Sequence, residues 1–198
     1  TAGVYHEFLT PAQIKERWPL VRTEDLKGAL FHPQDGYINP ADVTQAMAKG
    51  ARQRGVTIER KIQVDAYRWT GSEWIVSVTR MEEKGGMLVP SEEKYEIRAE
   101  HVVTATGNHA QRTARLLGIK IPAIPVEHQY IVTEPDPMLQ EYRKTHGEHP
   151  VLRDADAKWY VREERGGWIL GPYEYGAPAR FEYDVPESFR ADLFPLDL

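Results

Sequence analysis

The sequence contains no cysteine among its 198 residues. Disulfide bonds, thiolate metal sites and cysteine nucleophiles are therefore excluded for this chain. The sequence also lacks a basic cluster: its formal net charge is -5, and Lys, Arg, Asp and Glu are scattered along its length. A nucleic-acid surface needs clustered Lys and Arg, so we expect no nucleic-acid partner. No apolar run approaches the roughly 18 residues of a membrane-spanning helix, so we expect no membrane span.

Motifs of several enzyme classes are missing as well. The sequence has no Gly-x-Gly-x-x-Gly, no Walker-type glycine loop and no Gly-x-Ser-x-Gly segment. A complete dinucleotide fingerprint, a nucleoside triphosphatase and a serine hydrolase are therefore not indicated. The segment HGEHP at residues 146–150 carries metal-capable side chains, but its glycine and proline predict a loop without a fourth ligand, so we expect no metal site.

The clearest element present is a helix at residues 40–54. Asn39 is suited to its N-cap, Pro40 to its first position, and Gly55 to a left-handed stop. A shorter helix is predicted within residues 7–20, with Thr10 as its cap, and another at 109–117. The final stretch, 183–198, resembles the start of a further helix.

Apolar alternation predicts strands through most of the remaining chain. Four of them form an antiparallel meander with a hairpin tip at Gly85–Gly86, at residues 56–59, 61–69, 73–80 and 93–99. The others are at residues 101–107, 126–133, 158–162 and 167–171. The predicted fold class is therefore α/β with α+β character, mainly an antiparallel sheet flanked by helices.

Small residues end the predicted strand at 101–107. Ala105, Thr106 and Gly107 would let a ligand approach the backbone, because no large side chain covers its N–H and C=O groups. A dinucleotide site uses this geometry. A tight strand-to-helix turn explains the same residues, and their spacing alone favours that simpler interpretation.

Two further segments carry candidate substrate residues. In a strand, His128 and Tyr130 share one face and would be able to orient a carboxylate or an amine. Tyr173 and Glu174 follow the break at Gly171-Pro172 and would be able to line a pocket for a cationic amine. The alternatives are a half-buried strand with locally satisfied polar atoms, and an exposed strand end whose tyrosine caps the core.

Six blocks in this order resemble a known family, the FAD-dependent amine oxidoreductases of the dimethylglycine and sarcosine dehydrogenase type, within the D-amino-acid-oxidase-like group. They run from about residue 7 to 174: LTPAQIKERWPL, ALFHPQDGYINPADVTQAMAKGARQRGV, VVTATG, IPVEHQYIVT, PVLRDADAKWYVREE and ILGPYE. The resemblance implies an internal fragment, with the GxGxxG strand and a covalent FAD histidine upstream and a later flavin-contacting segment downstream. It divides the chain into part of an FAD-binding domain at 1–120 and a truncated substrate-binding domain at 121–198.

The resemblance also implies site residues. Val64 matches a position whose backbone contacts the adenine side of FAD, and 105–107 match the small-residue block beside the cofactor. His109 stands where these dehydrogenases usually carry a tryptophan. Tyr130, with His128, matches a tyrosine near the substrate, and residues 173–174 match the GPYE block on the substrate side.

The implied function is oxidative demethylation of N-methylated glycines or related amines by hydride transfer to FAD. The whole protein would be an enzyme and the isolated chain inactive, without retained FAD. Tetrahydrofolate through a missing domain, an electron-acceptor protein, and a cytoplasmic or mitochondrial-matrix location are further implications. A D-amino-acid or glycerol-3-phosphate oxidoreductase, or a non-catalytic binding module of the same fold, remains an alternative.

Overall fold

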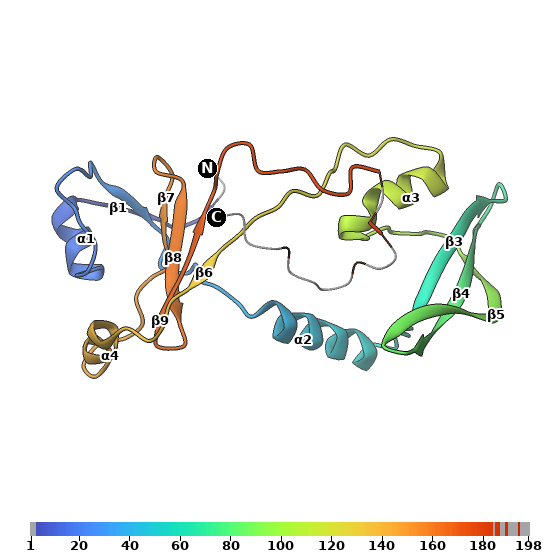
Figure 1. The fold of residues 1–198 in the computed structure, drawn as a ribbon, viewed down its shortest axis with the longest axis horizontal. Coiled ribbons are helices and arrows are strands. Elements are labelled where there is room, and N and C mark those ends of the chain that lie inside the picture. The colour runs from blue at the N-terminus through green and yellow to red at the C-terminus, as the bar shows by residue number, and fades with distance from the viewer. Residues whose placement is uncertain (1–2, 184, 187–188, 190–193, 195–198) are drawn as a thin grey trace. The chain divides into compact units, whose positions relative to one another are not determined.

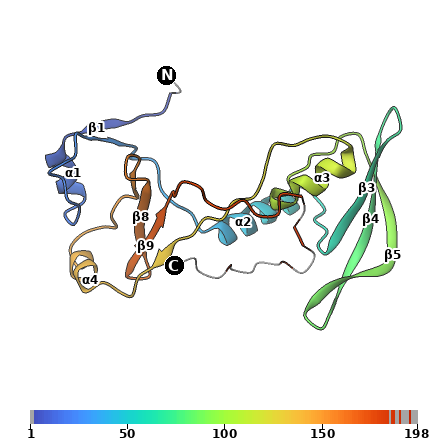
Figure 2. The ribbon, with the colours of Figure 1, turned by 45° about the horizontal axis from the view of Figure 1, so that its top comes forward.

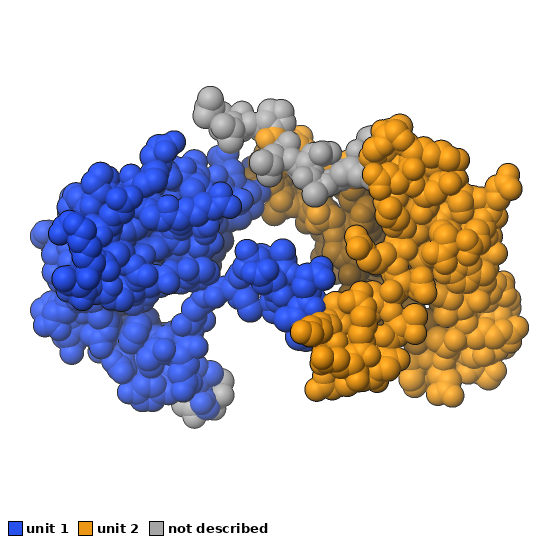
Figure 3. Space-filling view, turned by 90° about the horizontal axis from the view of Figure 1, so that it is seen from below, with its two compact units in different colours: residues 1–47, 128–176 blue, residues 48–127, 177–198 orange. Residues whose placement is uncertain are grey.

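The computed structural model describes residues 3–183, 185–186, 189 and 194. By their contacts, the residues form two compact units (Figure 3). Unit 1 comprises residues 1–47 and 128–176, and unit 2 comprises 48–127 and 177–198. The predicted helix start at 183–198 falls mostly outside the described residues and stays a prediction. The assignment of FAD binding to 1–120 and of substrate binding to 121–198 also stays a prediction.

Unit 1 is built on a four-stranded antiparallel sheet with the order β6-β9-β8-β7 (Figure 1). Its strands are β6 (Ile131–Val132), β7 (Leu152–Asp154), β8 (Trp159–Glu164) and β9 (Gly167–Pro172). The unit also contains a two-stranded sheet and two short helices: β1 (Glu7–Leu9), β2 (Ala29–Phe31), α1 (Pro11–Arg17) and α4 (Pro137–Arg143). Apolar residues of both helices reach its core, where Ile14 and Leu139 are buried.

Helix caps in the sequence set the ends of both short helices. Thr10 caps α1 as predicted, because its side chain accepts a hydrogen bond from the Gln13 backbone N–H in a capping box. The preceding residues 7–9 form β1 and are not part of that helix. Helix α4 was not predicted, although Asp136 accepts from the Met138 backbone N–H and Pro137 occupies the first turn.

Unit 2 contains a three-stranded antiparallel sheet with the order β3-β4-β5, and its strands lie side by side in two views (Figures 1 and 2). The strands are β3 (Ile62–Trp69), β4 (Trp74–Lys84) and β5 (Met87–Ala99). Both glycines of the predicted hairpin tip have positive φ, 61° at Gly85 and 77° at Gly86. Val76 and Val78 of the central strand are buried, as their alternation predicted.

The remaining helices also follow their predicted signals. Helix α2 (Pro40–Gln53) begins after Asn39, whose side chain accepts hydrogen bonds from two backbone N–H groups, and Gly55 has a φ of 86°. The short η1 (Gly107–His109) leads into α3 (Ala110–Leu117), which packs against β3. The fold class, mixed α/β with antiparallel sheets, is therefore confirmed.

Two predicted strands are wrong, and a third is much shorter than predicted. Residues 56–59 and 101–107 form no strand, and Gly107 begins η1. The segment 126–133 forms only the two-residue β6 and an isolated bridge at Val126. An apolar run becomes a strand only when a partner supplies the ladder of hydrogen bonds. The runs at 56–59 and 101–107 have no ladder partner within the described part of the chain.

Candidate functional site

One face of the unit 1 sheet carries an aromatic cluster. Tyr160 of β8 lies opposite Gly171 of β9 and Arg153 of β7 in the antiparallel ladders. A Cβ atom at Gly171 would overlap the ring of Tyr160. The ring therefore lies directly over the backbone of β9, in space that the glycine leaves free.

The rings of His128 and Tyr173 join Tyr160 to complete this cluster. The ring centroids of His128 and Tyr173 are 5.3 Å apart with an interplanar angle of 23°, a stacked arrangement. The Tyr160 centroid lies 6.0 Å from that of His128 and 5.5 Å from that of Tyr173. These separations are within the range of favourable ring pairs. We call His128, Tyr160 and Tyr173 the aromatic cluster.

Burial raises the pKa of Tyr160 above its ordinary value of 10.0, and the neighbouring phenols Tyr173 and Tyr130 add to the increase. Tyr130 lies next to β6, whose Ile131 pairs with Leu170 of β9. At neutral pH the Tyr160 hydroxyl is therefore protonated and able to donate or accept a hydrogen bond.

The structure thus brings together two of the four predicted substrate-side residues, His128 and Tyr173. The third, Tyr130, is 51% exposed and has no ring contact with them among the described residues. The fourth, Glu174, is exposed, and it makes no hydrogen bond or ion pair with any described residue. Tyr160 was not predicted as a site residue, although it lies in the strand predicted at residues 158–162. Only the pairing of β8 with β9 shows that its ring meets the other two.

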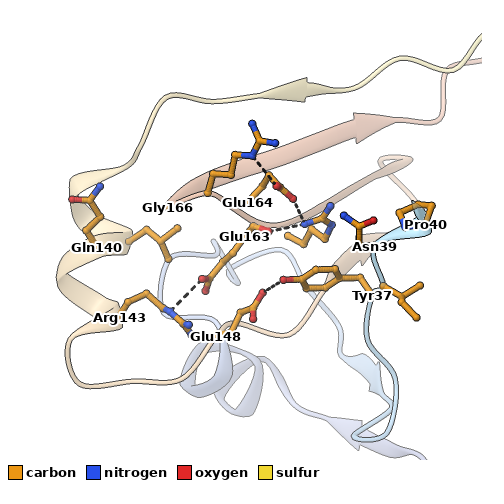
Figure 4. Close-up of a pocket in the computed structure, with 13 residues that line it drawn as sticks. Tyr37, Asn39, Pro40, Gln140, Arg143, Glu148, Glu163, Glu164 and Gly166 are labelled. Atoms are coloured by element: carbon orange, nitrogen blue, oxygen red, sulfur yellow. Dashed lines mark hydrogen bonds and ion pairs between the residues drawn. The ribbon is translucent and has the colours of Figure 1, made fainter. Parts of the chain in front are cut away.

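A second feature of unit 1 is a polar cavity of about 590 Å³ near the β8–β9 turn (Figure 4). The Tyr37 hydroxyl donates a 2.5 Å hydrogen bond to Glu148, which raises the pKa of Tyr37. The Arg162 guanidinium lies 4.2 Å from the Tyr37 ring centroid and pairs with Glu164 at 2.6 Å. The lining charges of this polar cavity are thus largely matched within the protein.

Glu163 forms the buried wall of the polar cavity. Its Oε1 accepts the backbone N–H of His149 at 2.7 Å and lies 2.6 Å from Nδ1 of the same residue. Its Oε2 lies 3.5 Å from Arg143 (Figure 4). The His149 ring packs against the rings of Trp18, Tyr142 and Trp168. Its Nε2 is buried and has no hydrogen-bond partner among the described residues. This arrangement stabilises the core, and we assign it no catalytic role.

The predicted cofactor residues all lie in unit 2. Ala105 and Thr106 precede η1, and Gly107 starts it with a φ of 53°. A Cβ at Gly107 would meet nothing within 4 Å, and this residue lines a small open cavity of about 160 Å³. The open backbone fits the close approach of a ligand such as FAD, as the small residues predicted. Their contact with the cofactor stays a prediction.

The other two predicted cofactor residues lie near this segment in the fold. Val64 is in β3, against which α3 packs, and it borders a register shift between residues 64 and 66. His109 is exposed at the end of η1. The side chain of Gln111 donates hydrogen bonds to the carbonyl groups of Ile121 and Ala123, which fixes the loop beside the small cavity.

Two kinds of feature are absent from the described residues. These residues contain no group of three or more His, Cys, Asp or Glu able to hold a metal ion. None of the helices that the structure describes is long and apolar enough to cross a membrane.

Comparisons with known proteins agree with the resemblance of the sequence blocks. The chain is 31% identical over 196 residues to the mitochondrial dimethylglycine dehydrogenase of Rattus norvegicus, covering 96% of this chain and 21% of the relative. It is 31% identical to the mitochondrial sarcosine dehydrogenase of Homo sapiens, covering 98% and 19%. The crystal structure of L-proline dehydrogenase from P.horikoshii matches with a TM-score of 0.62 and 25% identity, covering 85% of this chain and 41% of that one.

The chain spans about a fifth of the length of these two dehydrogenase relatives. The family model for FAD dependent oxidoreductases (DAO) matches residues 1–195, nearly the whole chain. This chain therefore belongs to the family of FAD dependent oxidoreductases.

Proposed function

We propose that the whole protein oxidises N-methylated glycines or related secondary and tertiary amines, and that unit 1 supplies the substrate side of its active site. The observation that carries this proposal is the convergence of His128, Tyr160 and Tyr173 on one face of the sheet. Aromatic faces attract alkylated ammonium groups, and ring hydroxyl and imidazole groups orient polar substrates.

A bound FAD would supply the acceptor for a hydride from the C–H bond next to the amine nitrogen. Water would hydrolyse the resulting iminium to formaldehyde and the demethylated amine, or its one-carbon group would pass to a folate. The protein's part is orientation and electrostatics. Tyr130 positions the substrate nitrogen and keeps its lone pair free, with His128 as its companion. Tyr173 and Glu174 belong to the substrate side, although Glu174 lies outside the aromatic cluster in this structure.

The cofactor side is assigned to unit 2. The open backbone at Gly107, with Ala105 and Thr106 before it, supports contact with FAD at this segment. Val64 and His109 are further proposed contacts. Tetrahydrofolate and an electron-acceptor protein are proposed for the whole protein alone, as is a location in the mitochondrial matrix or the cytoplasm. The two dehydrogenases reported above are mitochondrial.

A Tyr130→Phe substitution in the FAD-containing protein tests the proposal. We expect kcat/KM for dimethylglycine or sarcosine to fall about 10- to 100-fold, because one positioning hydrogen bond is lost. Reduction of an artificial electron acceptor measures turnover. Tyr175→Phe is the matched control, because Tyr175 is 89% exposed and lies outside the aromatic cluster. Unchanged kcat/KM in Tyr130→Phe would refute the role of Tyr130.

The same assay tests the function itself. Turnover of either amine by the unsubstituted protein supports the proposal. Turnover of a D-amino acid or of glycerol 3-phosphate without turnover of N-methylated amines would favour the corresponding alternative. Absence of all turnover in the FAD-loaded protein would favour a non-catalytic binding module.

A further inference from the structure

Two histidines lie opposite each other at the end of the β1–β2 ladder. The pairing of Glu7 with Phe31 is the last of this ladder, and His6 and His32 are the next residues on the two strands. Directly opposed residues of an antiparallel pair point to the same face, so the two imidazole rings lie on one surface. Their ring centroids are 5.9 Å apart, and the interplanar angle is 56°.

Hydrogen bonds to the backbone determine the tautomer of both rings. Nδ1 of His6 lies 3.1 Å from the carbonyl oxygen of Val4, and Nδ1 of His32 lies 3.4 Å from that of Tyr5. A carbonyl oxygen only accepts hydrogen bonds, so in each neutral ring Nδ1 carries the proton and Nε2 carries the lone pair. Neither Nε2 has a hydrogen-bond partner among the described residues. Histidines that bind metal ions have this same arrangement, in which the other ring nitrogen donates to a carbonyl group.

The distance between the rings permits a shared ion. A zinc–imidazole bond is about 2.0–2.1 Å long and a ring nitrogen lies about 1.1 Å from its ring centroid, so two rings that bind one ion have centroids at most about 6.4 Å apart. The measured 5.9 Å is below this limit. One metal ion between the two Nε2 atoms is therefore compatible with the spacing of the rings.

The surroundings of the pair favour a transition-metal ion. The neighbouring carboxylate, Glu7, points to the opposite face of β1, where it accepts a hydrogen bond from Tyr5 and pairs with Arg17 at 3.3 Å. The pair therefore offers imidazole nitrogen alone, a ligand that suits Zn²⁺ and Cu²⁺, whereas Mg²⁺ and Ca²⁺ prefer oxygen. His6 is exposed, so water is able to fill the remaining coordination positions.

No other two histidines in the described part of the chain are in ring contact. His146 and His149 are close in sequence, but both stack on the Tyr142 ring, at 4.2 and 4.1 Å, and this ring stands between them. His101 and His109 have no ring contact with any described residue. These histidines are therefore not placed to chelate one ion.

We propose that His6 and His32 form a binding site for a divalent transition-metal ion, Zn²⁺ or Cu²⁺, through their Nε2 atoms. The ion would clip β1 to β2 and close the loop that contains α1, whose Ile14 is part of the core of unit 1. A two-stranded ladder is marginally stable by itself, and a metal clip across a long loop stabilises it. The inference is independent of the proposed function, because neither histidine belongs to the substrate or cofactor residues. The sequence did not predict this pair, because it depends on the register of β1 and β2.

Calorimetric titration of the FAD-containing protein with Zn²⁺ or Cu²⁺ alone tests the site. We expect one ion bound at the pair in each chain, and no comparable binding of Mg²⁺. For His6→Gln and for His32→Gln we expect the Kd of this ion to rise about 100-fold, because a chelating pair becomes a single ligand. The double variant should show the same loss, since one substitution already removes the chelate. His101→Gln is the matched control and should leave the Kd unchanged, because His101 is exposed and has no ring contact.

Two further measurements distinguish chelation from a change in folding. Electron paramagnetic resonance of bound Cu²⁺ should show coupling to two imidazole nitrogens in the unsubstituted protein. Amide exchange in β1 and β2 should slow on addition of Zn²⁺ in the unsubstituted protein and stay unchanged in the double variant. Circular dichroism in the absence of metal establishes that each variant is folded.

Four results would overturn the inference. These are the absence of Zn²⁺ and Cu²⁺ binding in the unsubstituted protein, an unchanged Kd in either single variant, an equal loss in His101→Gln, and coupling of Cu²⁺ to a single nitrogen. Loss of binding in both single variants with an unchanged Kd in His101→Gln would support the inference. Amine turnover is not part of this test, so its failure would leave the proposed function standing.

Discussion

A Gly171→Ala substitution probes the position of the Tyr160 ring. The added Cβ would overlap this ring, which lies over the β9 backbone. Gly171 does not have a positive φ, so alanine is compatible with its backbone conformation. The three atoms nearest to the added Cβ all belong to Tyr160, so we expect the tyrosine ring to be displaced.

The cost follows from the contacts that the displaced ring gives up. Tyr160 makes two ring pairs, at 6.0 Å with His128 and 5.5 Å with Tyr173. Each such pair contributes about 0.5–1.5 kcal/mol beyond buried area. Loss of both predicts about 1–3 kcal/mol of destabilisation of unit 1, which matches the usual cost of an overpacked site.

Hydrogen exchange of the β8 and β9 amides measures this change, because it reports the opening free energy of a local region in a chain with two compact units. The double variant Tyr160→Ala/Gly171→Ala supplies the decisive comparison. Without the ring, Gly171→Ala should be neutral or stabilising by about 0.4–1 kcal/mol, since alanine restricts the unfolded chain. Gly147→Ala is the control, because a Cβ there meets nothing within 4 Å.

Two results would refute this reasoning. A Gly171→Ala variant as stable as the unsubstituted protein would mean that the Tyr160 ring does not occupy the space over Gly171. An equal loss of stability in the presence and absence of Tyr160 would place the clash elsewhere.

Two further substitutions test the core of unit 1. Glu163→Leu removes the acceptor of two His149 contacts and leaves Arg143 without its partner, so we expect the free energy of unfolding in urea to fall by about 3 kcal/mol. Arg143 is 40% exposed, which limits the cost of leaving its charge unpaired. Unchanged stability would contradict this prediction. A hydrogen bond from the Trp168 side chain, and to a smaller extent one from the Met138 backbone N–H, lowers the pKa of Asp136. Its stabilising contribution is therefore present above pH 3.8, the ordinary pKa, and is lost as the pH falls through the lower pKa of the folded protein. Asp136→Asn should remove this acid dependence of amide exchange in α4; an unchanged dependence would count against it.

Much of the fold was predictable because its signals are local. Thr10, Asn39 and Gly55 set helix ends through hydrogen bonds or backbone conformations within a few residues. The hairpin at Gly85–Gly86 is equally local. The segment 101–107 was predicted as a strand from its apolar residues, yet Val103 is 89% exposed and no strand pairs with it among the described residues.

The candidate site was predictable only in part, for a related reason. His128 and Tyr130 were predicted from their strand positions, Tyr173 from its place after the break at Gly171-Pro172, and all three from the family resemblance. Tyr160 and Arg153 depend on the register of β7, β8 and β9, which joins residues distant in sequence. Helix α4 was missed although Asp136 and Pro137 form a local start signal, because proline is also typical of loops.

The long meander of unit 2 has a consequence for association between copies of the protein. Strand β5 is thirteen residues long and is an outer strand of its sheet among the described residues. A long outer strand is a template for edge-to-edge pairing and aggregation. In β5 this tendency is opposed by Pro90, which has no backbone N–H to offer, and by the charged run Glu92-Glu93-Lys94. We expect these residues to oppose the use of β5 as a seed for intermolecular sheets.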